Sequence, residues 1–269
     1  MNKPDMGLAR WHGTCLRSVA AACAVMCWAG AATAGATTDG TTGAVQSLSG
    51  AFTVPQSLGT QRGSNLFHSF SRFSVGASES ATFTTTDTGI AHVISRVTGG
   101  EATLIEGPVR LQAATGSAPS FWFVNPSGIV VGPGGVFDVP AGLHLGTTPE
   151  LRFADGAVWR TGEAGGSSLT VAAPQGFGFL AAQPAGALQF IGNWSELAPG
   201  QELTLAGGDI ELRTAALSVP SGTVRVKASG ALALTDGARI DAIAYPIEGS
   251  GRIEVEAAAV RLDGGFRPW

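Results

Sequence analysis

Three short stretches in the last third of the chain decide the fold: Gly208-Asp-Ile-Glu-Leu212, Gly230-Ala-Leu-Ala-Leu234 and Gly251-Arg-Ile-Glu-Val255. They begin 22 and 21 residues apart, and each is a glycine followed by alternating residues that are apolar at the third and fifth positions. Alternation with a period of two is typical of a β-strand with one buried face. The same kind of strand therefore recurs at a nearly constant interval.

Two further series support this interval. The second begins at spacings of 22 and 21 residues and comprises Ala216-Leu-Ser-Val219, Ala238-Arg-Ile-Asp241 and Ala259-Val-Arg-Leu262. The third is weaker and comprises Leu203-Thr-Leu205, Val224-Arg-Val226 and Ile247, with a loop expected at Tyr245-Pro246. Three short strands per repeat is the layout of a parallel β-helix, whose coils bury their apolar faces by stacking. An antiparallel sandwich also has closely spaced strands, but it gives no reason for two series with one interval.

The rest of the chain is also typical of short strands. No stretch after Gly35 keeps a helical period for three turns, and alternating or apolar runs are separated by Gly, Pro, Asp and Ser. Examples are 81–86, 121–124 and 129–131. Glycine makes up 39 of the 269 residues and only 13% are charged, against about 25% charged in an average protein. The composition indicates an all-β fold with many tight corners.

Residues 1–34 are predicted to be a signal peptide. Lys3, Arg10 and Arg17 precede an apolar run at 18–30, and Ala32-Thr33-Ala34 has the A-x-A cleavage pattern. The run of 13 residues is short for a membrane anchor, which needs about 20. Such a leader would direct the chain out of the cytoplasm and be cleaved near Ala34, and the expected destination is the medium or the cell surface.

The composition excludes several classes of site. All three cysteines, Cys15, Cys23 and Cys27, lie in the expected leader, so the mature chain has no disulfide, cysteine-bound zinc or thiol nucleophile. The leader holds three of the 16 basic and one of the 20 acidic residues, so its removal changes the formal charge from −4 to −6. Nucleic acid is therefore not an expected partner. No cofactor or metal is expected.

One turn stands out in the centre of the chain. Asn125-Pro126-Ser127-Gly128 separates the apolar runs 121–124 and 129–131. Asn, Pro and Gly suit the first, second and fourth positions of a type I turn, and Ser is tolerated at the third. The residues alone predict a tight turn between two buried strands and say nothing about function.

The order of the motifs resembles the N-terminal secretion domain, or haemagglutination activity domain, of filamentous-haemagglutinin-like exoproteins. These are the passengers of two-partner secretion in Gram-negative bacteria. The resemblance covers about residues 50–265, and its blocks follow one another in the family's order. They are Phe52–Gly59, Gly63–Val75, Ser80–Phe83, Val93–Gly100, Phe123–Pro133, Leu151–Gly156, Phe177–Leu180, Pro199–Leu203 and Gly207–Glu211.

The resemblance implies a right-handed, single-stranded parallel β-helix with an N-terminal cap and extra-helical strands. It divides the mature chain into a secretion domain with the cap and first coils, 35–200, and further coils of the same solenoid, 201–269. It also implies export through the periplasm and recognition by the periplasmic domains of a dedicated outer-membrane transporter. The protein would be an adhesin-like exoprotein, possible partners including a host-cell or surface glycan, and not an enzyme.

The resemblance also assigns candidate residues. The turn Asn125, Pro126, Ser127 and Gly128 matches the family's secretion motif, although Ser127 stands where the family often has Asn, and a second Asn-Pro turn is absent. A second block matches the family's Asn-Leu-Phe-His-x-Phe pattern. Its residues are Asn65, Phe67, His68, Phe70 and Phe73, expected to pack the cap or, alternatively, to contact the transporter.

Other functions stay open as alternatives. Parallel β-helices include polysaccharide lyases, but the acidic residues here are scattered, with no D-x-D pair, and His68, His92 and His144 match no metal motif. An autotransporter passenger would need a C-terminal membrane barrel. A truncated secretion domain that lacks its effector region is a further alternative.

Overall fold

The structure is a computed structural model that describes residues 34–164, 167–243 and 251–264. Almost all of the expected signal peptide, together with Tyr245, Pro246 and Ile247, lies outside these residues. The described chain is all-β, apart from one short 3-10 helix, η1 (Gln56–Leu58). In these ranges no helix has the length and hydropathy needed to cross a membrane.

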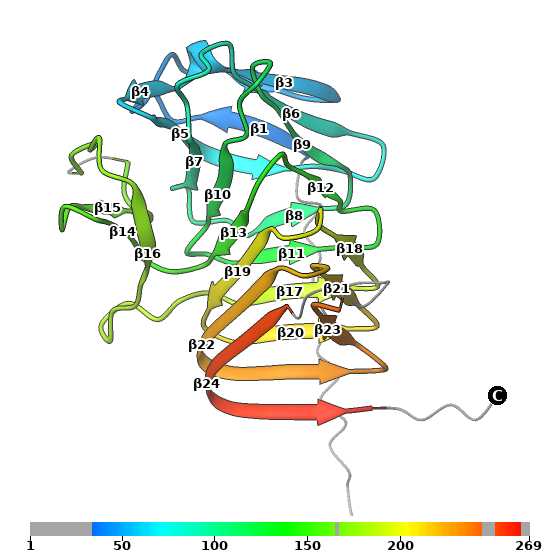
Figure 1. The fold of residues 1–269 in the computed structure, drawn as a ribbon. Helices are drawn as coiled ribbons and strands as arrows, with labels where there is room; N and C mark the ends of the chain where they lie inside the picture. Colours follow the sequence, from blue (N-terminus) through cyan, green and yellow to red (C-terminus); the bar gives the residue numbers. More distant parts are fainter. Residues whose placement is uncertain (1–33, 165–166, 244–250, 265–269) are drawn as a thin grey trace, which may run out of the picture. The chain divides into compact units, whose positions relative to one another are not determined.

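One array of parallel strands follows the chain from its first third to its end. Each strand is hydrogen-bonded to the next in the order β5-β7-β10-β13-β19-β22-β24, so neighbours in space are successive passes of the chain (Figure 1). The strands are β5 (Asn65–Ser74), β7 (His92–Val97), β10 (Ser120–Val124), β13 (Leu143–Gly146), β19 (Glu202–Gly207), β22 (Thr223–Thr235) and β24 (Arg252–Asp263).

A second parallel array belongs to the same sheet. It has the order β8-β11-β17-β20 and continues into the second halves of β22 and β24, which turn a corner between the two arrays (Figure 1). At that corner the register shifts between Ala228 and Ala231 of β22. The shorter strands are β8 (Thr103–Ile105), β11 (Ile129–Val131), β17 (Leu188–Ile191) and β20 (Ile210–Arg213).

Two smaller parallel sheets complete the passes. Their orders are β12-β9-β6-β3 and β18-β21-β23. The strands are β3 (Ala51–Pro55), β6 (Ser80–Thr84), β9 (Val109–Gln112), β12 (Phe137–Asp138), β18 (Trp194–Glu196), β21 (Ala216–Ser218) and β23 (Arg239–Asp241). The mostly parallel pairing excludes the antiparallel sandwich, because sandwich strands pair antiparallel.

Antiparallel strands occur at two places only in the described chain. β1 (Gly35–Thr38) and β4 (Thr60–Arg62) pair with β5, and β2 (Ser47–Leu48) pairs with β1. The second place is a separate sheet of β14 (Glu150–Phe153), β15 (Val158–Arg160) and β16 (Pro174–Gly178), with β14 in the centre. The family resemblance implied an N-terminal cap and extra-helical strands without assigning the extra strands to residues.

The register of the C-terminal passes agrees with the predicted interval except in the last one. Leu203 pairs with Val224 and Ile210 with Leu232, which are 21 and 22 residues apart. Ile253, however, pairs with Val224, 29 residues earlier.

The predicted grouping of the last strands was therefore wrong. Gly251–Val255 lies beside the Thr223 half of β22 and not beside 230–234, which instead pairs with 259–262. The reason is that all three series share the same two-residue alternation. Additional residues between β23 and β24 therefore change which strand β24 pairs with, while its pattern of alternating residues stays the same.

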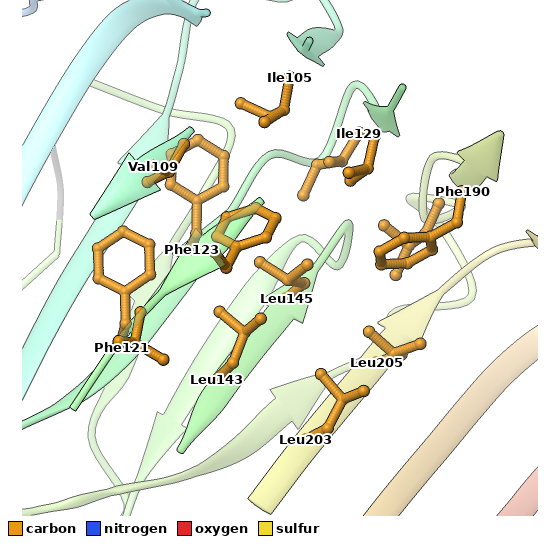
Figure 2. Close-up of a cluster of buried hydrophobic side chains, with 14 of the residues drawn as sticks. Ile105, Val109, Phe121, Phe123, Ile129, Leu143, Leu145, Phe190, Leu203 and Leu205 are labelled. Atoms are coloured by element: carbon orange, nitrogen blue, oxygen red, sulfur yellow. The ribbon is translucent and has the colours of Figure 1, made fainter. Parts of the chain in front are cut away.

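The main core fills the space between the arrays. Along the first array Phe121 pairs with Leu143 and Leu143 with Leu203, which places apolar side chains in a column, and Phe123, Leu145 and Leu205 form the adjacent column. Figure 2 shows both columns facing Ile105, Ile129 and Phe190 of the second array. Burying each such side chain stabilises the fold by roughly 1.5–3 kcal/mol.

A second, smaller core lies on the opposite face of the first array. It contains Phe67, Ile94 and Trp122 from parallel strands, and Leu151, Phe153 and Trp159 from the antiparallel sheet. The Phe67 ring lies 5.1 Å from the Trp159 ring and 5.9 Å from the Phe153 ring. The antiparallel sheet β14-β15-β16 therefore packs on the outer face of β5, β7 and β10.

Candidate functional site

The turn 125–128 joins β10 to β11, at the corner between the two arrays. The Gly128 amide donates to the Asn125 carbonyl at 3.0 Å, which closes the predicted turn. The Ser127 amide donates to Asn125 Oδ1 at 2.9 Å. Gly128 has φ +121°, a conformation that a side chain disfavours. The local sequence thus dictates a turn with its own side-chain cap.

Asn125 also holds this corner to the preceding pass. Its side chain is fully buried, and Nδ2 donates to the Glu101 carbonyl and to Thr103 Oγ1, each at 2.9 Å. Replacing the amide would leave buried polar groups without partners, at about 1–3 kcal/mol for each group. Asn125 is therefore a structural anchor of the corner.

The other turn residues differ in exposure. Ser127 is exposed, Pro126 is partly exposed and Gly128 is buried. Pro126 borders a hollow of about 180 Å³ formed with Pro149, Arg160, Gly162, Glu163, Gln183 and Pro184. The one place where the turn departs from the family pattern, Ser127, therefore lies on the surface.

A later segment of the chain, at Gly186, passes close to this turn. The Gly186 amide donates to the Pro126 carbonyl at 3.1 Å. A Cβ atom at Gly186 would lie 2.6 Å from that carbonyl oxygen. Only glycine therefore allows this approach.

Asn193 makes an equivalent corner that the sequence analysis did not single out. It is 2% exposed, and its Nδ2 donates to the carbonyls of Gly132, at 2.9 Å, and Gly135, at 2.6 Å. Ser195 Oγ donates to its Oδ1 at 2.6 Å. The available signal was the rarity of asparagine, since only Asn65, Asn125 and Asn193 follow the expected leader.

The second predicted block lies along β5 and is buried throughout. Asn65, Phe67, His68 and Phe70 are 0% exposed and Phe73 is 1% exposed. Because alternate strand residues face opposite sides, His68 and Phe70 enter the main core, whereas Asn65 and Phe67 lie beneath the antiparallel sheet.

Asn65 ties β5 to the chain that follows the antiparallel hairpin. Its Nδ2 donates to the carbonyls of Thr170, at 3.0 Å, and Ala172, at 2.7 Å. No side chain of the second predicted block is accessible in the folded domain.

His68 is unusual because, among the described residues, neither ring nitrogen has a hydrogen-bond partner of normal geometry. The ring lies 5.6 Å from the Phe83 ring and 6.3 Å from the Phe70 ring. Burial lowers the pKa of His68 to about 4, so it is neutral at pH 7. Such a residue is a packing element and is not placed for proton transfer.

The sequence analysis also did not identify a buried polar network around Arg96. Arg96 is 2% exposed, its guanidinium lies 4.5 Å from the centre of the Trp159 ring, and it donates to the Arg160 carbonyl. Its Nε donates to Ser69 Oγ at 2.8 Å. Burial lowers the pKa of Arg96, and the negative charge of Asp39 opposes that change.

A groove crosses the outer face of the first array near its later strands. It has a volume of about 440 Å³, with Trp122 and Phe177 on one side and charged side chains of β19, β22 and β24 on the other. Its charges are already paired, since Arg225 contacts Glu202 and Glu254, and Lys227 contacts Glu256 at 2.9 Å. In the ranges that the structure describes, no three acidic, histidine or cysteine residues cluster as metal ligands.

The comparison with known families decides the assignment. A family model described as the TPS secretion domain matches residues 34–264, nearly all of the chain after the expected leader. The chain belongs to the TPS secretion domain family. It is thus a two-partner secretion N-terminal domain, as its motif order predicts. No curated protein is similar enough to count as a match.

Family membership fits the geometry of the TPS domain described above. The matched range contains the described parallel sheets, both antiparallel elements and the turn at Asn125. A TPS domain is a secretion-substrate domain. This agrees with a fold in which the buried polar residues form hydrogen bonds that hold the corners and the packed strands together.

Proposed function

We propose that the protein is a secreted exoprotein whose TPS domain is recognised by the periplasmic domains of a dedicated outer-membrane transporter. The match to the TPS secretion domain over residues 34–264 carries this proposal. The predicted leader at 1–34 would bring the chain to the periplasm. Function is then recognition and export, and no catalytic step is assigned to any residue.

The finer architecture belongs to the same proposal. Successive passes that pair in parallel, at intervals of 21 and 22 residues in the C-terminal third, favour a right-handed β-helix with β1, β2 and β4 as its N-terminal cap. Residues 35–200 would be the secretion domain with its first coils, and 201–269 would continue the same solenoid.

The burial of the candidate residues limits the stage at which the transporter can contact them. Asn125 and the five candidate residues of the second block have almost no accessible surface in the folded domain; those five are Asn65, Phe67, His68, Phe70 and Phe73. A partner could contact these side chains only before the domain folds, which agrees with export of an unfolded chain. After folding, the same residues hold corners and core together.

An adhesin-like role outside the cell, with a host-cell or surface glycan as ligand, is the family expectation for the exported protein. No described residue is assigned to that role. The transporter interaction has priority because the family match supports it and the turn 125–128 corresponds to the family's secretion motif.

The test is secretion from a Gram-negative cell with and without the partner transporter. We expect the protein in the medium only when the transporter is present. Asn125→Ala is expected to lower secretion by tenfold or more. Asn193→Ala is the matched control, because it also removes a buried amide that bridges two groups of the preceding pass.

The two variants separate recognition from folding. If both lower secretion equally, Asn125 acts through stability alone and the turn is not a recognition motif. If the unchanged chain reaches the medium without any such transporter, the proposed function is wrong.

A further inference from the structure

Within the described residues, the last strand, β24, has an edge and an apolar face that no other segment covers. β24 pairs with β22, and no other described strand pairs with it. Its inward side chains stand beside Val224, Val226 and Leu232 of β22, which are at most 2% exposed. The exposed fractions on β24 are 45% for Ile253, 47% for Val255, 54% for Val260 and 71% for Leu262. A strand edge of this kind is a template for pairing.

The sequence of β24 is complementary to its own reverse. It reads Arg-Ile-Glu-Val-Glu-Ala-Ala-Ala-Val-Arg-Leu-Asp from 252 to 263. If two copies ran antiparallel about a centre between Ala257 and Ala258, opposite charges and matching apolar side chains would face each other. The facing pairs would be Arg252 with Asp263, Glu254 with Arg261, Ile253 with Leu262, and Val255 with Val260.

The corner in β24 is compatible with this arrangement. The strand turns near Ala258, where its register with β22 shifts, so it has two legs of similar length, 252–257 and 259–263 (Figure 1). A twofold axis that bisects this corner exchanges the two legs and reverses their direction. It also keeps the inward face of each leg on the inward side, so the apolar interiors of two copies would join.

We propose that β24 is a self-association surface that pairs antiparallel with β24 of a second copy of this chain. Under this twofold axis each leg of one copy pairs with the other leg of the second copy, so association ends at a dimer. Pairing two copies in parallel and in register would instead place Glu254 against Glu254 and Glu256 against Glu256. Like charges directly opposite each other destabilise a strand pair. The proposal does not depend on the secretion function.

Chain-specific cross-linking tests the register. The experiment uses the full chain with Cys15→Ser, Cys23→Ser and Cys27→Ser, so that introduced cysteines are the only ones. One sample carries Val255→Cys and the other Val260→Cys. Under oxidation we expect a covalent dimer only when the two are mixed, because residue 255 faces residue 260 of the partner. A dimer of either variant alone would indicate parallel or nonspecific contact and overturn the proposal, as would no cross-link at all.

Charge reversal gives an independent test by analytical ultracentrifugation. Arg252→Asp alone would place two carboxylates opposite each other at the 252–263 pair, and Asp263→Arg alone would place two guanidinium groups there. We expect each variant to dissociate at least fivefold more readily than the unchanged chain, and an equimolar mixture to regain the dimer.

Val171→Asp is the matched surface control, since Val171 is 66% exposed and remote from β24 in the chain. Association through the leader would survive the charge reversals, and a monomer at all concentrations would mean that another segment covers β24. Either result rejects the proposal.

Discussion

Arg96 and Asp39 are joined through a shared hydroxyl group. Arg96 Nε donates to Ser69 Oγ at 2.8 Å, and Ser69 Oγ donates to Asp39 Oδ2 at 2.5 Å. A second route runs from Arg96 through Thr41 Oγ1 to Asp39 Oδ1, with donor–acceptor distances of 3.3 and 2.7 Å. The network ties the chain after β1 to β5 and β7, and the contact of Arg96 with the Arg160 carbonyl extends it to β15.

Arg96→Lys should destabilise the domain although it keeps the positive charge. A lysine cannot reproduce the planar guanidinium that reaches Ser69, the Arg160 carbonyl and the Trp159 ring. We expect the free energy of unfolding to fall by about 2–4 kcal/mol, because buried polar groups lose their partners. Urea unfolding measures it, with the exposed Arg62→Lys as control. Equal midpoints for the two variants would contradict the role of the network.

Asp39 should make stability depend on pH in the acidic range. Burial raises its pKa, but hydrogen bonds from Ser69, Thr41 and Thr98 outweigh that, so its folded pKa is below the ordinary value of 3.8. Its contribution is present above the unfolded pKa and is lost as pH falls through the folded pKa. Asp39→Asn should therefore lower the melting temperature at pH 7 and have less effect near pH 3. A constant difference between pH 7 and pH 3 would refute this assignment.

His68 should act in a higher pH window. Its folded pKa of about 4 is below the ordinary 6.5, so the unfolded chain binds a proton that the folded chain does not. Stability should thus fall as pH decreases from 6.5 to 4, by about 3 kcal/mol from His68 alone. His144, whose pKa burial also lowers to about 4, adds to the same trend.

The measurement for His68 is urea unfolding of the unchanged chain and of His68→Leu at pH 7.5 and pH 4.5. The loss of stability between the two pH values should be clearly smaller in the variant, since leucine cannot bind a proton. Parallel changes in both proteins would show that His68 is already charged or accessible in the folded state.

Gly186→Ala should disturb the turn at Asn125 without changing any of its residues. A Cβ atom would lie 2.6 Å from the Pro126 carbonyl oxygen and 2.7 Å from the Gly128 amide nitrogen. We expect a loss of about 1–3 kcal/mol in unfolding free energy, typical of overpacking. Gly176→Ala is the control, because a Cβ atom there meets nothing within 4 Å. Comparable effects of both substitutions would count against a tight fit at Gly186.

Local patterns predicted much of the fold. The strands at 121–124 and 129–131 and the turn between them followed from apolar runs flanking Asn-Pro-Ser-Gly, and the structure has them as β10, 125–128 and β11. The grouping of 251–255 failed because two-residue alternation fixes which side chains face inward but not which neighbour a strand pairs with. The order of motifs predicted the family, which the match over 34–264 confirms.

The network of Arg96 could not be predicted in this way. Asp39, Ser69, Arg96 and Arg160 come from four separate segments, and no spacing along the chain relates them. Asn193 was missed for a similar reason, since its partners Gly132 and Gly135 lie about 60 residues earlier and are backbone carbonyls that any residue offers. Contacts of this kind become visible only once the passes are placed side by side.

The buried asparagines affect how accurately each strand aligns with the strand of the preceding pass. Strands that repeat with nearly the same pattern could slip past one another by a whole pass and still bury apolar side chains. Such a slip would separate Asn125 from Thr103, and Asn193 from the carbonyls of Gly132 and Gly135, and each amide would lose these hydrogen bonds. Because each amide left buried without a partner would cost about 1–3 kcal/mol, these residues act against misaligned stacking. They select one alignment among several that the repeated strands alone would permit.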